Sequence, residues 1–318
     1  MSSTLTDPFI LNQRLGRGVN IIGYDDPIWK SRSTGRMQAK HFQLIRAAGF
    51  NHVRINLHPF RFMGSAPEFT IQPAWLETLD WAIEQCRVNG LLAILDLHEF
   101  TALAVAPFGL KPKYLAAWRQ LAAHCQDAPE DVLFEILNEP NTRLTSEIWN
   151  DYLKEPLALI RASHPTRTLI IGPAYWNGID YLHRLELPAY DRHIIVTVHY
   201  YHPMAFTHQG APWSAENKDR TGVTWLGTEA EKQAIQRDFA GVQAWAVGYQ
   251  RPILLGEFGA YDKGDMESRV RYTSFVAREA ERLGWSWSYW QFDSDFIAFD
   301  IDHERWVEPI RDALIPTG

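Results

Sequence analysis

Short apolar segments recur along the 318-residue chain, and each is followed by a longer amphipathic stretch. The expected strands are 17–23, 52–57, 91–98, 133–138, 168–172, 194–201, 252–258 and 285–292. The expected helices are 37–48, 73–89, 112–126, 145–163, 229–248, 265–283 and 304–314, with a short one after the fifth strand. Strands that are apolar on both faces need helices on both sides, as in parallel sheets. This alternation predicts a single α/β domain over residues 1–318, a (β/α)8 or TIM barrel.

Proline and glycine positions support this division into elements. Helices are expected to begin near Pro73 and Pro112 and to end at Gly49, Gly90 and Gly284. A doubly wound open sheet is the alternative fold. That fold usually carries a glycine-rich phosphate turn after its first strand, whereas this chain has "GYDDPIW" there. No Gly/Ser-rich linker divides the sequence, so one domain is expected.

Composition excludes several classes of protein. The net charge is −7, and no basic run is interleaved with aromatic residues, so a nucleic-acid partner is not expected. No apolar run reaches membrane-spanning length. The segment "MSSTLTDPFILNQ" does not resemble a signal peptide, which leaves a cytoplasmic protein or a secreted one whose leader is absent from this sequence. Cys86 and Cys125 have no CxxC spacing; two buried free thiols are expected, with one disulfide as the alternative.

Polar residues stand where the predicted strands end, which is where (β/α)8 barrels place their active sites. They are Arg54, Asn56, His58, Asp96, His98, Glu99, Asn138, Glu139, His199, Tyr201, His202, Glu257, Trp290 and Gln291. One such residue could be a satisfied buried group or a helix cap. A whole set that shares one rim indicates a site instead. The chain has 13 tryptophans, some of which could form a surface that stacks on a ligand; alternatively, they simply fill a Trp-rich core.

Two of these residues suggest a reaction. Glu139 ends the fourth strand and Glu257 the seventh, on opposite sides of the barrel mouth. Paired carboxyls across a cleft suit glycoside hydrolysis, in which one protonates the leaving oxygen and the other attacks the sugar carbon. Burial beside a carboxylate would keep the acid protonated, whereas Arg54 and Tyr201 would keep the nucleophile ionised. Asn138 can donate to a sugar hydroxyl. The separation of the carboxyls, which decides between retention and inversion, is not readable from the sequence.

Five segments resemble the family 5 glycoside hydrolases, the cellulase-type retaining enzymes. They are "GFNHVRINL", "LFEILNEPN", "VTVHYYHPMAFTHQGAPW", "PILLGEFGAY" and "SYWQF", in family order across roughly residues 15 to 315. The resemblance implies Glu139 as acid/base and Glu257 as nucleophile. The surrounding shell that it implies is Arg54, His98, Asn138, His199, Tyr201 and Trp290, with His208 and Trp213 on a loop lining the sugar cleft. Trp176 would be a stacking platform on the leaving-group side, or else an ordinary loop tryptophan.

The resemblance implies an endo-β-1,4-glucanase that acts on β-glucan polysaccharides or oligosaccharides without a metal or organic cofactor. Three departures from the family pattern affect the sugar-binding walls: "IGYDDP" after the first strand, Glu99 after His98, and Gln291 after Trp290. A β-mannanase or a mixed-linkage glucan or xyloglucan hydrolase therefore remains open.

Two other classes of protein share some of these features. A metal hydrolase could draw its ligands from His98, Glu99, His199, His202 and His208. Their spacing does not match the closely spaced sets that such barrels use. A non-catalytic sugar-binding barrel would keep the aromatic residues and would lose one of the two glutamates.

Overall fold

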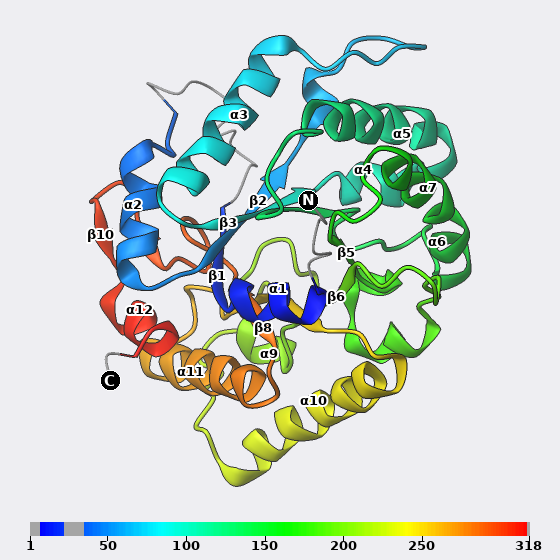
Figure 1. Cartoon of the computed structure of the whole chain (residues 1–318). Coiled ribbons are helices and arrows are strands. Elements are labelled where there is room, and N and C mark those ends of the chain that lie inside the picture. Colours follow the sequence, from blue (N-terminus) through cyan, green and yellow to red (C-terminus); the bar gives the residue numbers. More distant parts are fainter. Residues whose placement is uncertain (1–6, 22–34, 317–318) are drawn as a thin grey trace.

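The eight expected strands close into one parallel barrel (Figure 1). The computed structural model describes residues 7–21 and 35–316. The barrel strands are β1 (Arg17–Ile21), β2 (His52–Leu57), β3 (Leu92–Leu97), β4 (Val132–Glu135), β5 (Leu169–Ile171), β6 (Ile194–Tyr200), β7 (Ile253–Phe258) and β8 (Ser286–Tyr289). Each strand pairs with the next, and β8 pairs back with β1, so the predicted (β/α)8 fold is confirmed and the open sheet is excluded.

Helices surround this barrel (Figure 1). They are α1 (Pro8–Leu15), α2 (Ala39–Ala48), α3 (Pro73–Val88), α4 (Phe100–Val105), α5 (Pro107–His124), α6 (Ser146–Tyr152), α7 (Lys154–Ser163), α8 (Ala174–Asn177), α9 (Met204–Thr207), α10 (Glu229–Tyr249), α11 (Met266–Arg282) and α12 (Glu308–Leu314). A small hairpin, β9 (Phe299–Asp300) with β10 (Arg305–Trp306), follows the last barrel strand. No helix in the described ranges is long and apolar enough to cross a bilayer.

Most predicted boundaries agree with the structure, and the differences have local causes. The expected helix over 145–163 is two helices, which meet at Leu153. Helix α5 begins already at Pro107, so Pro112 lies inside it rather than in its first turn. Proline suits the first helical position because its missing N–H has no partner there anyway, so either residue was a possible start. The predicted first-strand end at 22–23 and the whole of "GYDDPIW" lie outside the described residues.

Three glycines and two cysteines behave as the sequence predicts. Gly49, Gly90 and Gly284 follow helices with φ values of +108°, +66° and +76°, a region that residues with a Cβ rarely adopt. Cys86, in α3, and Cys125, directly after α5, are both buried and free. The disulfide alternative is therefore wrong.

Helix α1, which the sequence analysis did not predict, seals the amino end of the barrel (Figure 1). Leu11 and Leu15 of α1 pack with an inner ring of strand residues: Leu92, Ile94, Leu133, Ile170, Ile195 and Leu254. Asn12 donates to the backbone oxygen of Ile253 at 3.0 Å and accepts from the Ser286 hydroxyl at 2.6 Å. The helix thus closes the amino end of the barrel with apolar side chains, whereas the polar residues lie at the carboxyl end.

We expect Leu15→Ala to lower the free energy of unfolding by about 2–5 kcal/mol, because it opens a cavity in a closed apolar layer. Ile10, on the same helix, is 56% exposed, so Ile10→Ala is the matched control and should change stability by less than about 0.5 kcal/mol. Urea denaturation followed by circular dichroism would measure both. Equal effects of the two substitutions would show that α1 does not seal the barrel.

Candidate active site

The carboxyl ends of the strands meet in a buried polar cluster centred on Arg54, a residue of β2 with no exposed surface. Its Nη1 donates to Glu257 and to Asn20, both at 2.8 Å. Its Nη2 donates to Asn138 at 2.8 Å. Its Nε and Nη2 donate to the two oxygens of Glu135 at 2.6 and 2.8 Å. One guanidinium therefore links β1, β2, β4 and β7.

Glu257 lies on β7 and is 4% exposed. Its Oε1 accepts from Arg54, and its Oε2 accepts from the Tyr201 hydroxyl at 3.0 Å. Burial raises the pKa of Glu257 to about 7, and Glu139 adds to the rise, while His199 and Arg54 oppose it. The predicted contacts of Arg54 and Tyr201 are confirmed, but burial limits the ionised form of this carboxyl to about pH 7 and above.

Glu139 follows β4 with a left-handed backbone, at φ +42°. Its Oε1 accepts from His199 Nδ1 at 2.7 Å. Burial raises the pKa of Glu139 to about 8; Arg54 opposes this rise, and the nearby carboxyls of Asp96 and Glu135 add to it. This carboxyl is therefore protonated at neutral pH, for the two reasons that the sequence suggested.

His199, on β6, connects Glu139 to a residue that the sequence analysis missed. Burial lowers the pKa of His199, so the ring is neutral. With Nδ1–H donated to Glu139, the other nitrogen, Nε2, accepts from the side-chain amide of Asn177 at 3.2 Å. Asn177 ends α8, a turn in which Tyr175, Trp176 and Asn177 all have φ between +52° and +59°. No motif in the sequence marks this turn.

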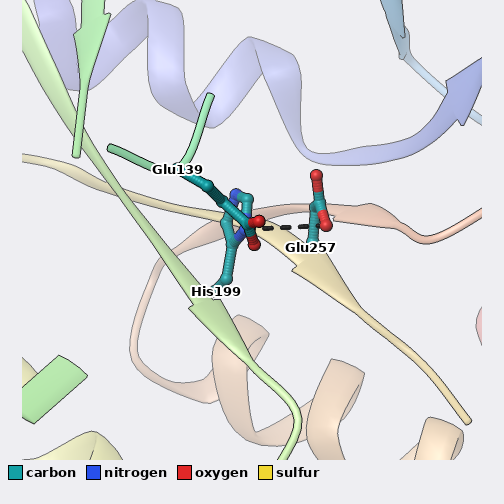
Figure 2. A group of neighbouring side chains, drawn as sticks. All are labelled: Glu139, His199 and Glu257. Atoms are coloured by element: carbon teal, nitrogen blue, oxygen red, sulfur yellow. Dashed lines mark hydrogen bonds and ion pairs between the residues drawn. The ribbon is translucent and has the colours of Figure 1, made fainter. Parts of the chain in front are cut away.

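The two glutamates and His199 converge at the barrel mouth (Figure 2). One ligand atom from each of Glu139, His199 and Glu257 lies within 4.8 Å of the others. Carboxyls of retaining glycosidases stand about 5–5.5 Å apart, whereas those of inverting enzymes leave roughly 6.5–9.5 Å for a water molecule. One oxygen of each glutamate lies within 4.8 Å of an oxygen of the other, which is close enough for the shorter of these two arrangements.

A stacked pair forms one wall of the site. Trp290 is 8% exposed and lies parallel to the His98 ring, with centroids 5.8 Å apart and an interplanar angle of 9°. His98 Nδ1 donates to Asp96 at 2.5 Å, and its Nε2 accepts from the Asn138 amide at 3.3 Å. These bonds fix the histidine ring and therefore the tryptophan that packs on it.

The loop aromatics take different positions. Trp176 is 50% exposed, and its backbone N–H donates to the carbonyl oxygen of Pro140, so the backbone of α8 contacts the segment directly after Glu139. Trp213 is 53% exposed and packs edge-on against Tyr261. His208 is buried and meets the Tyr201 ring edge-on at 4.9 Å, so it supports the tyrosine that bonds Glu257.

The residues considered for a metal are not gathered into one site. Among the described residues, the one cluster with ligand spacing is Glu139, His199 and Glu257. It contains none of His98, Glu99, His202 and His208. Glu99 accepts from the backbone N–H of Phe60 at 2.6 Å, and His202 is exposed beside Tyr200. In this cluster, His199 Nδ1–H is donated to Glu139, which joins the ring and this carboxyl by a hydrogen bond.

The family model "Cellulase (glycosyl hydrolase family 5)" matches residues 13–295, so the chain belongs to this family. Endoglucanase H of Acetivibrio thermocellus is 28% identical over 323 residues, which cover 100% of this chain and 34% of that protein. Cellulase/esterase CelE of the same organism is 25% identical over 285 residues, 84% of this chain and 34% of that protein. The chain thus spans about a third of the length of these two relatives.

Solved structures resemble the chain over nearly its whole length. Thermotoga maritima Cel5A in complex with cellobiose is 38% identical, with a TM-score of 0.91, over 97% of this chain and 100% of that one. The same enzyme in complex with mannotriose is 38% identical, with a TM-score of 0.92 and the same coverage. These likenesses agree with the barrel and with the family.

We expect the two carboxyls to ionise in separate steps, Glu257 near pH 7 and Glu139 near pH 8, because their surroundings differ. Carbon NMR of protein labelled at the glutamate carboxyl carbons would follow both titrations. Glu257→Gln should remove the lower step and keep the upper one, and Glu139→Gln should do the reverse. Loss of the upper step in Glu257→Gln would show that the order is inverted.

Proposed function

We propose that this chain is a retaining endo-β-1,4-glucanase of the cellulase type that cleaves β-1,4-glucan by double displacement. The observation that carries the proposal is a pair of glutamates in unlike surroundings, each with a carboxyl oxygen within 4.8 Å of one on the other. A pair of titratable groups whose environments push their pKa values apart supports a division into acid and nucleophile. Membership of glycosyl hydrolase family 5 supports the same class of reaction.

In the first step, Glu257 attacks the anomeric carbon while Glu139 gives its proton to the leaving glycosidic oxygen. Arg54 and Tyr201 hold the two oxygens of Glu257, so the attacking atom is fixed before substrate arrives. The hydroxyl of Tyr201 and the guanidinium of Arg54 favour the ionised carboxylate that attack requires. The products are a glycosyl–Glu257 ester and a released sugar with a new hydroxyl.

In the second step, Glu139, now ionised, takes a proton from water as the water attacks the same carbon and frees Glu257. His199 acts on Glu139 in both steps, because its Nδ1–H donates a hydrogen bond to that carboxyl. This hydrogen bond favours the ionised form of Glu139 and so eases loss of its proton. Two inversions at one carbon give net retention of configuration. The steps use only side chains and water.

The main substrate is proposed to be β-1,4-glucan, and a β-mannan or mixed-linkage glucan is the second candidate. The glucan assignment rests on the endoglucanases among the relatives. The mannan candidate rests on Cel5A of Thermotoga maritima, 38% identical, whose structure was solved with mannotriose. Glu99 and Gln291, where the family pattern differs, lie directly after His98 and Trp290, at the wall that would meet the sugar.

Hydrolysis of carboxymethylcellulose, mixed-linkage β-glucan and β-mannan should be compared side by side. We expect glucan cleavage, with the β-anomer appearing first in proton NMR of the products. Glu257→Gln and Glu139→Gln should each stay folded and lose activity by at least about 10³-fold. Mannan cleavage alone would move the assignment to a mannanase. Full activity in either variant, or an α-anomer as first product, would overturn the mechanism.

Tyr201→Phe should slow hydrolysis less than Glu257→Gln does, by about 10- to 100-fold, because it removes one hydrogen bond to the nucleophile and leaves the carboxylate in place. Initial rates on the best substrate would measure both variants. Tyr261→Phe is a control, because this ring supports Trp213 rather than the nucleophile. A loss in Tyr201→Phe as large as that in Glu257→Gln would show that Tyr201 has a larger role.

A further inference from the structure

Glu135 is a buried glutamate that the proposed mechanism does not use. It is the last residue of β4, has no exposed surface, and lies among the apolar residues of the strand. Both of its oxygens accept from Arg54, at 2.6 and 2.8 Å. Burial raises the pKa of Glu135, and the charged guanidinium of Arg54, which donates to both oxygens, opposes this rise. The two groups form a bidentate ion pair with no access to solvent.

This ion pair determines how Arg54 faces the nucleophile. A guanidinium is planar, and contact with both Nε and Nη2 leaves it little freedom to rotate in its own plane. The remaining N–H groups of Arg54 then point at Glu257, Asn20 and Asn138, each at 2.8 Å. The position of Arg54 Nη1 beside Glu257 therefore depends on an acceptor that does not itself touch the nucleophile.

We propose that Glu135 is a positioning residue for the proposed hydrolysis, which acts by holding Arg54 in the orientation that fixes Glu257. Glu135 also belongs to a cluster in which the guanidinium of Arg54 is the counter-ion of several buried carboxyls. Its negative charge can therefore change the pKa of a neighbouring carboxyl. The charged or titratable groups around it are Arg54 on β2, Asp96 on β3, Glu139 after β4, His199 on β6 and Glu257 on β7.

The charge of Glu135 also acts on Glu139. Burial is the main cause that raises the pKa of Glu139, and the negative charges of Asp96 and Glu135 raise it further. Replacing Glu135 by a neutral residue removes part of that repulsion, so the pKa of Glu139 falls. The alkaline side of the activity profile, where Glu139 loses the proton it must donate, should then move to lower pH.

The competing explanation is that Glu135 merely stabilises the fold, as buried ion pairs elsewhere do. Asp191 offers a matched control, because it forms a bidentate pair with Arg161 at 2.7 and 3.1 Å and is 8% exposed. It precedes β6 and so lies at the amino end of the barrel, away from Glu257. Asp191→Asn breaks a comparable ion pair without touching the cluster around Arg54.

Three variants test the proposal: Glu135→Gln, Glu135→Asp and Asp191→Asn. Measurements of kcat, KM and the pH profile on the best glucan, with thermal melts, would be made on each. Glu135→Gln should lower kcat by about tenfold or more, change KM by less than about threefold, and move the alkaline limb to lower pH. Glu135→Asp keeps the charge but is one methylene shorter, so kcat should fall while the alkaline limb stays. Asp191→Asn should lower only the melting temperature.

The proposal rests on the hydrolysis proposed above, and the two can fail separately. A wild-type protein that cleaves none of the glycans would overturn the proposed function. An active wild type whose Glu135 variants keep its kcat and pH profile would overturn the positioning role alone. The same holds if Asp191→Asn reproduces their kinetic changes, because loss of any buried ion pair would then explain them.

Discussion

The buried charge of Arg54 is the constraint on which the site depends. A guanidinium without exposed surface is costly unless every N–H finds an acceptor and the charge finds a counter-ion. Its donors are taken up by Glu135, Glu257, Asn20 and Asn138, residues of three other strands or their ends. The barrel mouth is therefore organised around one cation, and each carboxyl near it is held in a particular place.

Glu139 and Glu257 are the same type of residue, but they have different neighbours at the barrel mouth. Glu257 receives hydrogen bonds from Arg54 and Tyr201, which favour its ionised form against the effect of burial. Glu139 receives one from His199 and lies near other buried carboxyls, which adds to the effect of burial. The difference in proton affinity that an acid and a nucleophile require thus follows from which neighbours each strand end meets.

The two ends of the barrel differ: the amino end is closed by an apolar layer, and the carboxyl end carries the polar residues of the site. At the amino end, α1 covers an apolar ring with Leu11 and Leu15. At the carboxyl end, the left-handed turn of α8 presents Trp176 to solvent and Asn177 to His199. Consecutive non-glycine residues with positive φ are unfavourable, and such backbone persists where the surrounding contacts hold it. Here the turn is held by the bond of Asn177 to His199, by the backbone bond of Trp176 to Pro140 and by the stacking of Tyr175 on Tyr181.

The eight strands, most helices and the barrel could be predicted from the sequence, as could the placement of Glu139 and Glu257 on one rim of the barrel. Apolar periodicity and strand-end polarity are local properties, and the shared rim of a closed barrel converts them into one site. The contacts of Glu135 with Arg54, of Asn177 with His199 and of His208 with Tyr201 emerge only in the folded barrel. The same holds for the 4.8 Å bound on the ligand atoms of Glu139, His199 and Glu257. Those facts depend on which side chains from distant strands meet inside the barrel. Strand tilt and register set such meetings, and no single segment of sequence encodes them.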